Sequence, residues 1–200
     1  MNGQPTAELA AMAARLVVEE GLEYGPAKRK AARMLGRGTA RGGRSMPDND
    51  EIEDEVRSYL ALFHADTQPA ELAALRRVAL DWMQRLAEFR PHLTGAAWRG
   101  TATRLSSVHL ELFCDDPKSA EIALINQGVR FDATGAAGPR GGAAALSLQT
   151  RCPELGEPVN VVLTILDHDD LRGALRPDRR GRSERGDRLA LQRLIAQEEP

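Results

Sequence analysis

The hydrophobic pattern changes period near Pro91, and this change is the strongest constraint on the fold. Between Leu72 and Phe89, apolar residues recur in alternating steps of three and four, the spacing of one face of an amphipathic helix. Beyond residue 92, apolar and polar residues alternate, as expected for strands. We therefore expect an α+β protein, with a helical region over residues 1–91. Residues 92–200 are expected to form a mixed sheet of about four or five strands and a C-terminal helix.

Three further helices are expected before the Leu72–Phe89 stripe. TAELAAMAARLVVEE is followed by Gly21, and PAKRKAARMLG has a proline in its first turn and ends in Gly36. A third helix should begin near Asn49, because its acidic first turn suits the positive end of the helix dipole. The intervening RGTARGGRSMPDND has no periodicity and is expected to be an exposed loop.

The C-terminal region is expected to alternate strands with short helices. A short turn with helical character, TATRLS, should separate its first two strands, and helices are expected at PKSAEIALINQG and ERGDRLALQRLIAQ. The expected strands are LTGAAWRG, SVHLELFC, VRFDA, AALSLQT and VNVVLTIL.

Composition excludes several classes of protein. The formal net charge of -2 gives no overall attraction to nucleic acid or to an anionic membrane. No apolar run approaches the roughly 20 residues that span a bilayer, and the N-terminus lacks the pattern of a signal peptide. Cys114 and Cys152 have no metal-ligand spacing and are expected to pack as small apolar residues. A cytoplasmic protein is expected.

A basic segment begins at Lys28, Arg29, Lys30 and Arg33. It could be a nucleic-acid contact surface on a helix-turn-helix, which would make the protein a regulator. Alternatively, it is a solvated helix face whose charge is balanced by the acidic helix that follows. The absence of interleaved aromatic residues favours the solvated face.

The segment GTATRLSSVHLELF, residues 100–113, has the order of a phosphate-binding turn followed by a metal-binding strand. Nucleotidyl transfer uses two divalent metal ions held by carboxylates. Residues i and i+2 of a strand point to the same face and can therefore hold one metal site together. At these two positions the chain has Ser107 and His109.

This segment resembles the Gly-Ser … Ser-Asp-x-Asp motif of the nucleotidyltransferase-fold superfamily, which includes polymerase β-like proteins. In the resemblance, Gly100 and Thr101 match the glycine turn, and Ser106 matches the serine before the first acid. Ser107 and His109 replace the two acids, and Asn160 is nearest to the position of the third. The resemblance implies a nucleotidyltransferase-like fold with a degenerate active site.

Two functions follow from this resemblance. A degenerate member would bind a nucleotide or another phosphate ligand with little or no transfer activity. An active member would use an atypical site with His109 and Glu111 as catalytic residues. Glu111 and Asp115 would then hold a metal, with Mg²⁺ or Mn²⁺ as a cofactor. The expected nucleotide-binding residues are Gly100, Thr101, Arg104, Ser106 and Ser107.

Over nearly its full length the chain also resembles an uncharacterised proteobacterial family. The resemblance rests on AKRKAA, FHADTQPAELAALRRVAL, FRPHLTG and an Arg-rich segment after LDHDDLR. Its members are often labelled UDP-N-acetylmuramate–alanine ligase. The chain has no G-x-x-x-x-G-K-[ST] loop for ATP phosphates and is shorter than a three-domain ligase, so the sequence does not support that label. The Leu72–Phe89 stripe could pack within the chain or across a homodimer.

Overall fold

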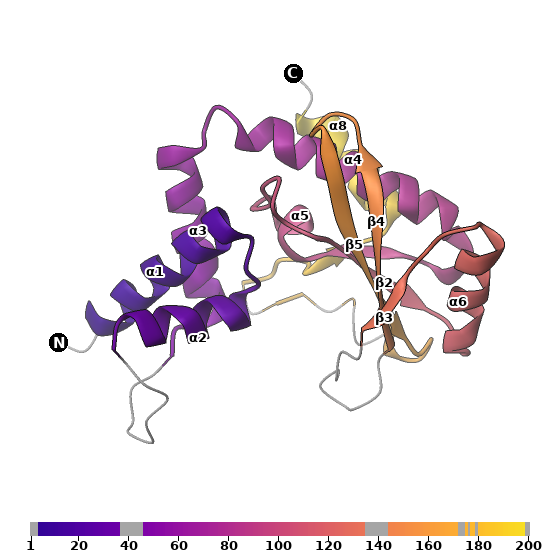
Figure 1. The fold of residues 1–200 in the computed structure, drawn as a ribbon, viewed down its shortest axis with the longest axis horizontal. Coiled ribbons are helices and arrows are strands. Elements are labelled where there is room, and N and C mark those ends of the chain that lie inside the picture. The colour runs from indigo at the N-terminus through magenta and orange to yellow at the C-terminus, as the bar shows by residue number, and fades with distance from the viewer. Residues whose placement is uncertain are drawn as a thin grey trace. The chain divides into compact units, whose positions relative to one another are not determined.

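The computed structural model describes residues 4–36, 46–134, 144–171, 175, 177–178 and 180–198. The protein is α+β, with N-terminal helices followed by a six-stranded mixed sheet (Figure 1). It divides into two compact units, residues 1–69 with 101–106, and residues 70–100 with 107–200. The division differs from the boundary expected near residue 91, because the whole Leu72–Phe89 stripe belongs with the sheet.

The first unit contains the three expected helices, α1 (Gln4–Glu20), α2 (Tyr24–Met34) and α3 (Asn49–Phe63). Small side chains in their core let the helix backbones approach closely, and Ala13, Ala27 and Ala31 are fully buried. The helix α3 begins with a capping box, in which Asp48 accepts from the Glu51 backbone N–H at 2.8 Å and Glu51 accepts from that of Asp48.

Gly21 makes the turn between α1 and α2. Its φ of +65° is left-handed, and a Cβ there would lie 2.6 Å from the carbonyl oxygen of Leu105. Both features require glycine. This close approach brings the 101–106 loop against the turn within the first unit.

The second unit contains the sheet, in the strand order β3-β4-β5-β2-β1-β6. β2 and β5 are parallel, and the other neighbouring pairs are antiparallel. Its strands are β1 (His92–Thr94), β2 (Val108–Phe113), β3 (Asp132–Thr134), β4 (Ala144–Cys152), β5 (Glu157–Leu166) and β6 (Arg185–Gly186). Its helices are α4 (Gln68–Arg85, which begins in the first unit), the 3-10 turn η1 (Ala87–Phe89), α5 (Gly95–Arg99), α6 (Pro117–Asn126) and α8 (Arg188–Glu198).

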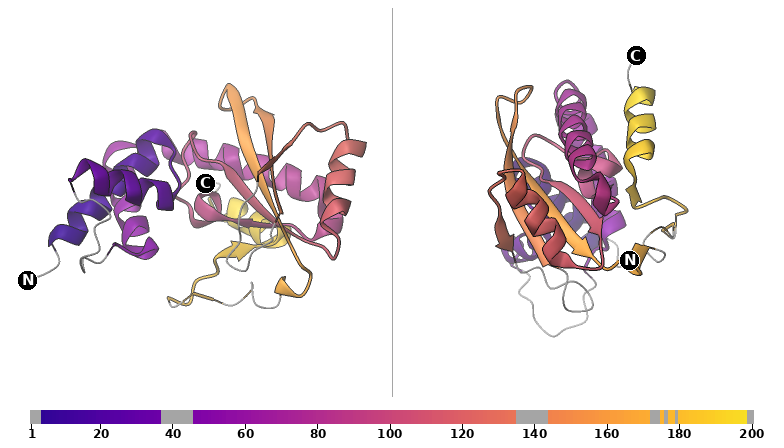
Figure 2. Two further views of the ribbon diagram at one scale, coloured as in Figure 1. Left: turned by 60° about the horizontal axis from the view of Figure 1, so that its bottom comes forward. Right: turned by 90° about the vertical axis from the view of Figure 1, so that its right-hand side faces the viewer.

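One face of the sheet forms the core of this unit. The strand register aligns four buried leucines on neighbouring strands, and α4 and the residue after it contribute Leu75, Met83 and Leu86 to the buried set. Figure 2 shows α4 and α8 on the same side of the sheet. Because the stripe on α4 is buried within a single chain, its burial does not require a second copy. The aligned leucines are Leu93, Leu110, Leu163 and Leu146.

Several sequence-based expectations about the chain beyond residue 71 are wrong. LTGAAWRG is not one strand, because β1 ends at Thr94 and α5 follows at Gly95. The 101–106 segment contains no helix. The stripe does not form one helix to Pro91, because α4 ends at Arg85 and Arg90 adopts a left-handed φ of 48°. The sheet has six strands, whereas about four or five were expected. The additional strand is β6, which was not predicted from the sequence.

The remaining expected elements are confirmed with shifted ends. The expected helices at 117–128 and 184–197 are α6 and α8, and the strands expected at 107–114, 129–133, 144–150 and 159–166 are β2, β3, β4 and β5. Most of the expected 37–50 loop lies outside the described residues. No described helix is both long and apolar enough for a bilayer.

Candidate functional site

The second face of the sheet carries the sequence-predicted strand residues. His109 pairs in register with Thr94 on β1 and with Val162 on β5, and Thr94 pairs with Arg185 on β6. The residues on this face are mostly half-buried, unlike the leucines opposite. We call this set the polar face: Ser147, Gln149, Asn160, Val162, Thr164, Ser107, His109, Glu111, Thr94 and Arg185.

Asn160 is the centre of a hydrogen-bond cluster on the polar face. Its amide Nδ2 donates to the Ser107 hydroxyl at 3.1 Å, and its Oδ1 accepts from the Ser147 hydroxyl at 2.8 Å. Gln149 Nε2 also donates to Oδ1 at 3.5 Å. The structure therefore brings Ser107 together with Asn160, the residue suggested for the third acid position.

Glu111 on β2 forms a largely buried ion pair with Arg185 of β6. Burial raises the pKa of the Glu111 carboxyl, while the Arg185 guanidinium opposes that rise. Glu111 is the one carboxylate in the polar face, and it is already paired. The Nη1 group of Arg185 makes this ion pair. Its Nε–H is also buried and has no acceptor among the described residues.

His109 lies between Ser107 and Glu111 along β2, and a glycine packs over its ring. Gly95 has a φ of +71°, and a Cβ there would lie 3.5 Å from the His109 ring carbon Cδ2. The glycine that approaches this strand is thus Gly95 at the start of α5. Sequence reasoning assigned the glycine turn to Gly100, which instead ends α5 with a φ of 82° and an N–H donated to the Ala96 carbonyl.

The other expected nucleotide-binding residues belong to the first unit. Thr101 is buried, and its hydroxyl has no described partner. Ser106 closes a local turn, because its hydroxyl accepts from the Thr103 N–H at 3.0 Å and its own N–H donates to the Thr103 carbonyl at 2.8 Å. Arg104 is exposed. Gly100 and Ser107, on either side of this segment, belong to the second unit.

The acidic residues that follow β2 either cap the next helix or are exposed to solvent. Asp116 caps α6 by accepting from the Lys118 N–H at 3.0 Å, and Asp115 is exposed beyond the strand end. Burial, followed by the charges of these two carboxylates, raises the pKa of the neighbouring Cys114 thiol. Thiolate chemistry is therefore disfavoured at Cys114, and Cys152 is buried as expected.

No group of three His, Cys, Asp or Glu side chains that could hold a metal ion occurs in the described part of the chain. The acidic residues 167–170 form a turn, in which an Asp167 carboxylate oxygen accepts from the Asp169 N–H at 2.9 Å. Divalent Mg²⁺ relies on carboxylate and water oxygens. The described side chains therefore offer no ready metal centre.

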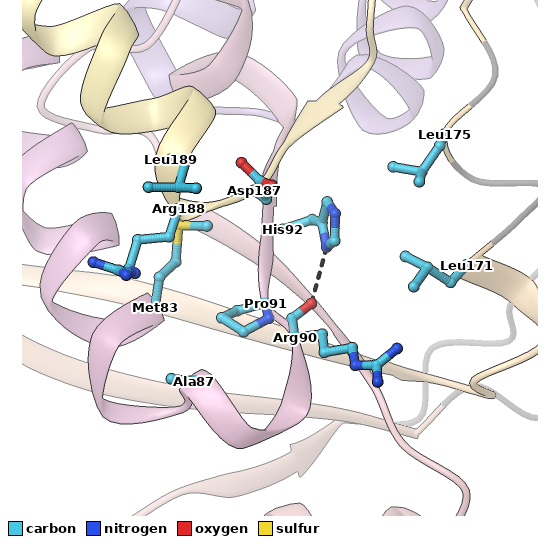
Figure 3. A pocket seen from close by; sticks show the side chains of 10 residues that line it. All are labelled: Met83, Ala87, Arg90, Pro91, His92, Leu171, Leu175, Asp187, Arg188 and Leu189. Carbon is cyan, nitrogen blue, oxygen red and sulfur yellow. Dashed lines mark hydrogen bonds between the residues drawn. The ribbon is translucent and has the colours of Figure 1, made fainter.

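A cavity of about 370 Å³ lies beside β1 and the start of α8. The buried His92 ring borders it, with Nδ1 2.9 Å from the Arg90 carbonyl oxygen (Figure 3). The same ring makes an edge-on contact with Phe113. The Asp187 carboxylate that also borders it is used to cap α8, since it accepts from the Ala190 N–H at 2.8 Å. The rest of the lining is mainly apolar: Met83, Ala87, Pro91, Leu171, Leu175 and Leu189.

The basic residues of α2 are only partly available to a ligand. Lys30 pairs with Glu20, and Lys28 is half-buried. Arg29 and Arg33 are exposed and lie one helical turn apart. Of the four basic residues expected to contact nucleic acid, two are therefore exposed to solvent.

Sequence reasoning missed Arg185 and Gly95. Arg185 is distant in sequence and lies on a two-residue strand too short to show alternation. Gly95 was placed inside an expected strand, although an isolated glycine there is itself a signal of a bend or a close approach. No family model and no curated protein matches the chain. A proposal about function therefore has to be argued from the geometry and charge of the described residues.

Proposed function

We propose that this chain is a degenerate nucleotidyltransferase-like protein that binds a nucleotide or another phosphate ligand on the polar face, without metal-dependent transfer. The observation that carries the proposal is the Ser107–Asn160 hydrogen bond. It joins two neutral side chains at positions where the resemblance places metal-binding acids. The scaffold would thus keep a ligand surface while lacking the charges that hold the metals.

Electrostatics disfavour transfer chemistry at this face. The carboxylate of Glu111 would have to leave Arg185 to bind a metal, which would leave a largely buried guanidinium unpaired. Asp115 lies beyond the end of β2 and is exposed. The alternative of an active enzyme using His109, Glu111 and Asp115 therefore has less support than ligand binding.

The same face offers donors to phosphate oxygens. Hydroxyl, amide and guanidinium N–H groups all bind phosphate, and charged donors bind it more strongly. Ser107 and Asn160 supply neutral donors, and the half-buried Arg185 guanidinium adds a positive charge to the face. A ligand phosphate would compete with the internal bonds of Asn160 for these donors.

The test is calorimetric titration of the full chain with ATP, GTP, CTP and UTP, each with and without Mg²⁺. We expect one nucleotide to bind without metal and to bind at least about fivefold more weakly to Ser107→Ala, since one hydrogen bond is lost. Ser58→Ala, in α3, is the matched control and should bind as the wild type does. Nucleotide transfer that requires Mg²⁺, or no binding of any nucleotide or of inorganic phosphate in the same titration, would contradict the proposal.

A second candidate is nucleic-acid binding through α2, favoured by the exposure of Arg29 and Arg33. Phosphate contacts of this kind weaken steeply with salt. Arg29→Gln/Arg33→Gln should lower the affinity for duplex DNA and flatten its salt dependence. Binding that is indifferent to both changes would exclude this candidate.

A further inference from the structure

The outer edge of β4 is only partly covered by its neighbour. β3 pairs with β4 only from Ala145 to Ser147, whereas β5 pairs with β4 as far as Cys152. Figure 1 shows the β4–β5 hairpin continuing beyond the short β3. Among the described residues, the β3 side of β4 therefore has no strand partner from Leu148 to Cys152. Backbone N–H and C=O groups along such an edge are available for pairing.

A groove of about 770 Å³ lies along this edge, between residues 148–151 of β4 and residues 128–131 that lead into β3. Three arginines line it, from three different elements or segments: Arg85, Arg130 and Arg151. Asp132 is the one carboxylate among the lining residues. The groove therefore has an excess of positive charge, in a chain whose net charge is slightly negative.

Arg85 and Trp82 form a fixed wall of the groove. The Arg85 guanidinium lies 3.9 Å from the centre of the Trp82 ring, and its Nε and Nη2 donate to the Gln127 side-chain oxygen at 3.2 and 3.1 Å. This arrangement holds the guanidinium in place before any ligand arrives. Arg130 and Arg151 are exposed and could close over a ligand.

Trp82 gives a second, independent indication of a ligand. It is 2% exposed, and its indole N–H has no acceptor among the described residues. A buried donor without an acceptor costs about 1–3 kcal/mol, so such groups normally have partners. A carbonyl or carboxylate oxygen brought into the groove could supply one.

From these observations we propose that the groove binds an acidic peptide segment in an extended conformation, which adds to β4 beside residues 148–152. The free edge supplies main-chain hydrogen bonds, and the three arginines select acidic side chains. Trp82 is covered by Arg85, so it offers no open ring for base stacking, which disfavours single-stranded nucleic acid. The groove shares Ser147 and Gln149 with the polar face, but not Ser107, Asn160 or Arg185, on which the function proposed for that face rests.

The test uses the full chain and a fluorescein-labelled octapeptide of alternating Glu and Val, measured by anisotropy. We expect saturable binding that weakens at least tenfold in Arg130→Glu/Arg151→Glu. The control Arg29→Glu/Arg33→Glu makes the same change of net charge on α2, and its affinity should stay within twofold of the wild type. An octapeptide of alternating Lys and Val should not bind.

Two further measurements distinguish edge pairing from simple charge attraction. Peptide binding should slow hydrogen exchange of backbone amides within residues 148–152, and N-methylation of alternate peptide amides should abolish binding. The proposal would be overturned if both double variants lost the same peptide affinity, or if hydrogen exchange of the β4 amides were unchanged by the peptide. It would also be overturned if oligo-dT bound more tightly than the acidic peptide. Absence of peptide binding at millimolar concentration would overturn it as well.

Discussion

At the scale of single residues, Gly186 determines whether β6 can join the sheet. A Cβ at this position would lie 2.2 Å from two atoms of the Trp98 ring, much closer than atoms can approach. The Trp98 indole N–H donates to the Ser183 carbonyl at 2.8 Å, which limits how far the ring can move. Gly186→Ala should therefore destabilise the protein by about 1–3 kcal/mol, the usual cost of overpacking. Urea unfolding measures this loss.

The matched control for this change is Gly25→Ala in α2. A Cβ there would meet only the end of the Arg29 side chain, at 3.5 Å. Alanine stabilises a helix relative to glycine by about 0.5–1 kcal/mol. The two substitutions should thus have opposite signs, and a Gly186→Ala protein as stable as the wild type would disprove the close packing of β6 on Trp98.

Glu111 gives a pH dependence whose sign follows from its burial. Burial raises the pKa of its carboxyl in the folded protein, with Arg185 opposing the rise. The folded state then binds the proton more tightly than the unfolded state does, so Glu111 contributes stability below its unfolded pKa, about 4.3. That contribution is lost as the pH rises through the raised value. Relative to Glu111→Gln, the wild type should lose free energy of unfolding over this pH window.

Urea unfolding of both proteins at several pH values from 4 to about 7.5 tests this expectation. Glu88→Gln, an exposed carboxylate in η1, serves as the control. A difference between wild type and Glu111→Gln that grows in favour of the wild type with pH would mean that the Arg185 charge outweighs burial. The raised pKa would then be wrong.

At the scale of elements, Arg76 of α4 fixes the end of α5. The side chain is 1% exposed, its Nε donates to the Ala97 carbonyl at 2.9 Å, and its Nη2 donates to the Trp98 carbonyl at 3.3 Å. It also pairs with Glu198 of α8. These contacts satisfy carbonyls that a five-residue helix leaves without partners and tie three helices together.

Arg76→Met should therefore destabilise the protein by about 2–4 kcal/mol, because a buried and a partly buried carbonyl lose their donor. Arg77→Met is the matched control, since Arg77 is half-exposed and makes a 3.4 Å ion pair with Glu154 that should contribute about 0–1 kcal/mol. Thermal unfolding of the two variants compares them directly. Similar losses in both would contradict the role of Arg76 at α5.

Most of the elements that sequence reasoning identified have long, regular patterns, although the shorter strands β2 and β3 were also expected. The helices α1, α3 and α4 and the strands β4 and β5 each run for nine or more residues, so their periods are clear. The elements it missed are short and set by tertiary contacts: α5 depends on Arg76, and β6 depends on the space above Trp98. No local pattern could reveal an arginine that caps a helix 21 residues away in sequence.

At the scale of the whole molecule, sequence predicted the α+β class and the shared face of Ser107, His109 and Glu111. The i, i+2 period of β2 guarantees that face once the strand exists. The partners on it could not be predicted, because Arg185 reaches Glu111 through a register between strands far apart in sequence. The units also interleave, since residues 101–106 belong with the helices and both flanking segments with the sheet.

The polar face allows a direct test of whether this scaffold lacks only its acids. Ser107→Asp/His109→Asp would place two carboxylates on one face of β2, beside Asn160 and at the positions named by the resemblance. Because hard divalent ions prefer carboxylate oxygens, the double variant should bind Mn²⁺ at least about tenfold more tightly than the wild type. Calorimetry measures this gain, with circular dichroism as a check on the fold.

The control is Ile122→Asp/Asn126→Asp, which introduces two carboxylates one helical turn apart on α6, where both side chains are exposed. Carboxylates there are more strongly screened by water than those beside the half-buried Asn160, so their gain in Mn²⁺ affinity should be smaller. Equal gains would show that two added charges suffice on any exposed surface. No gain in a folded Ser107→Asp/His109→Asp protein would show that the face does not have the geometry of a nucleotidyltransferase metal site, and the ligand would then have to be sought among molecules that bind without metal.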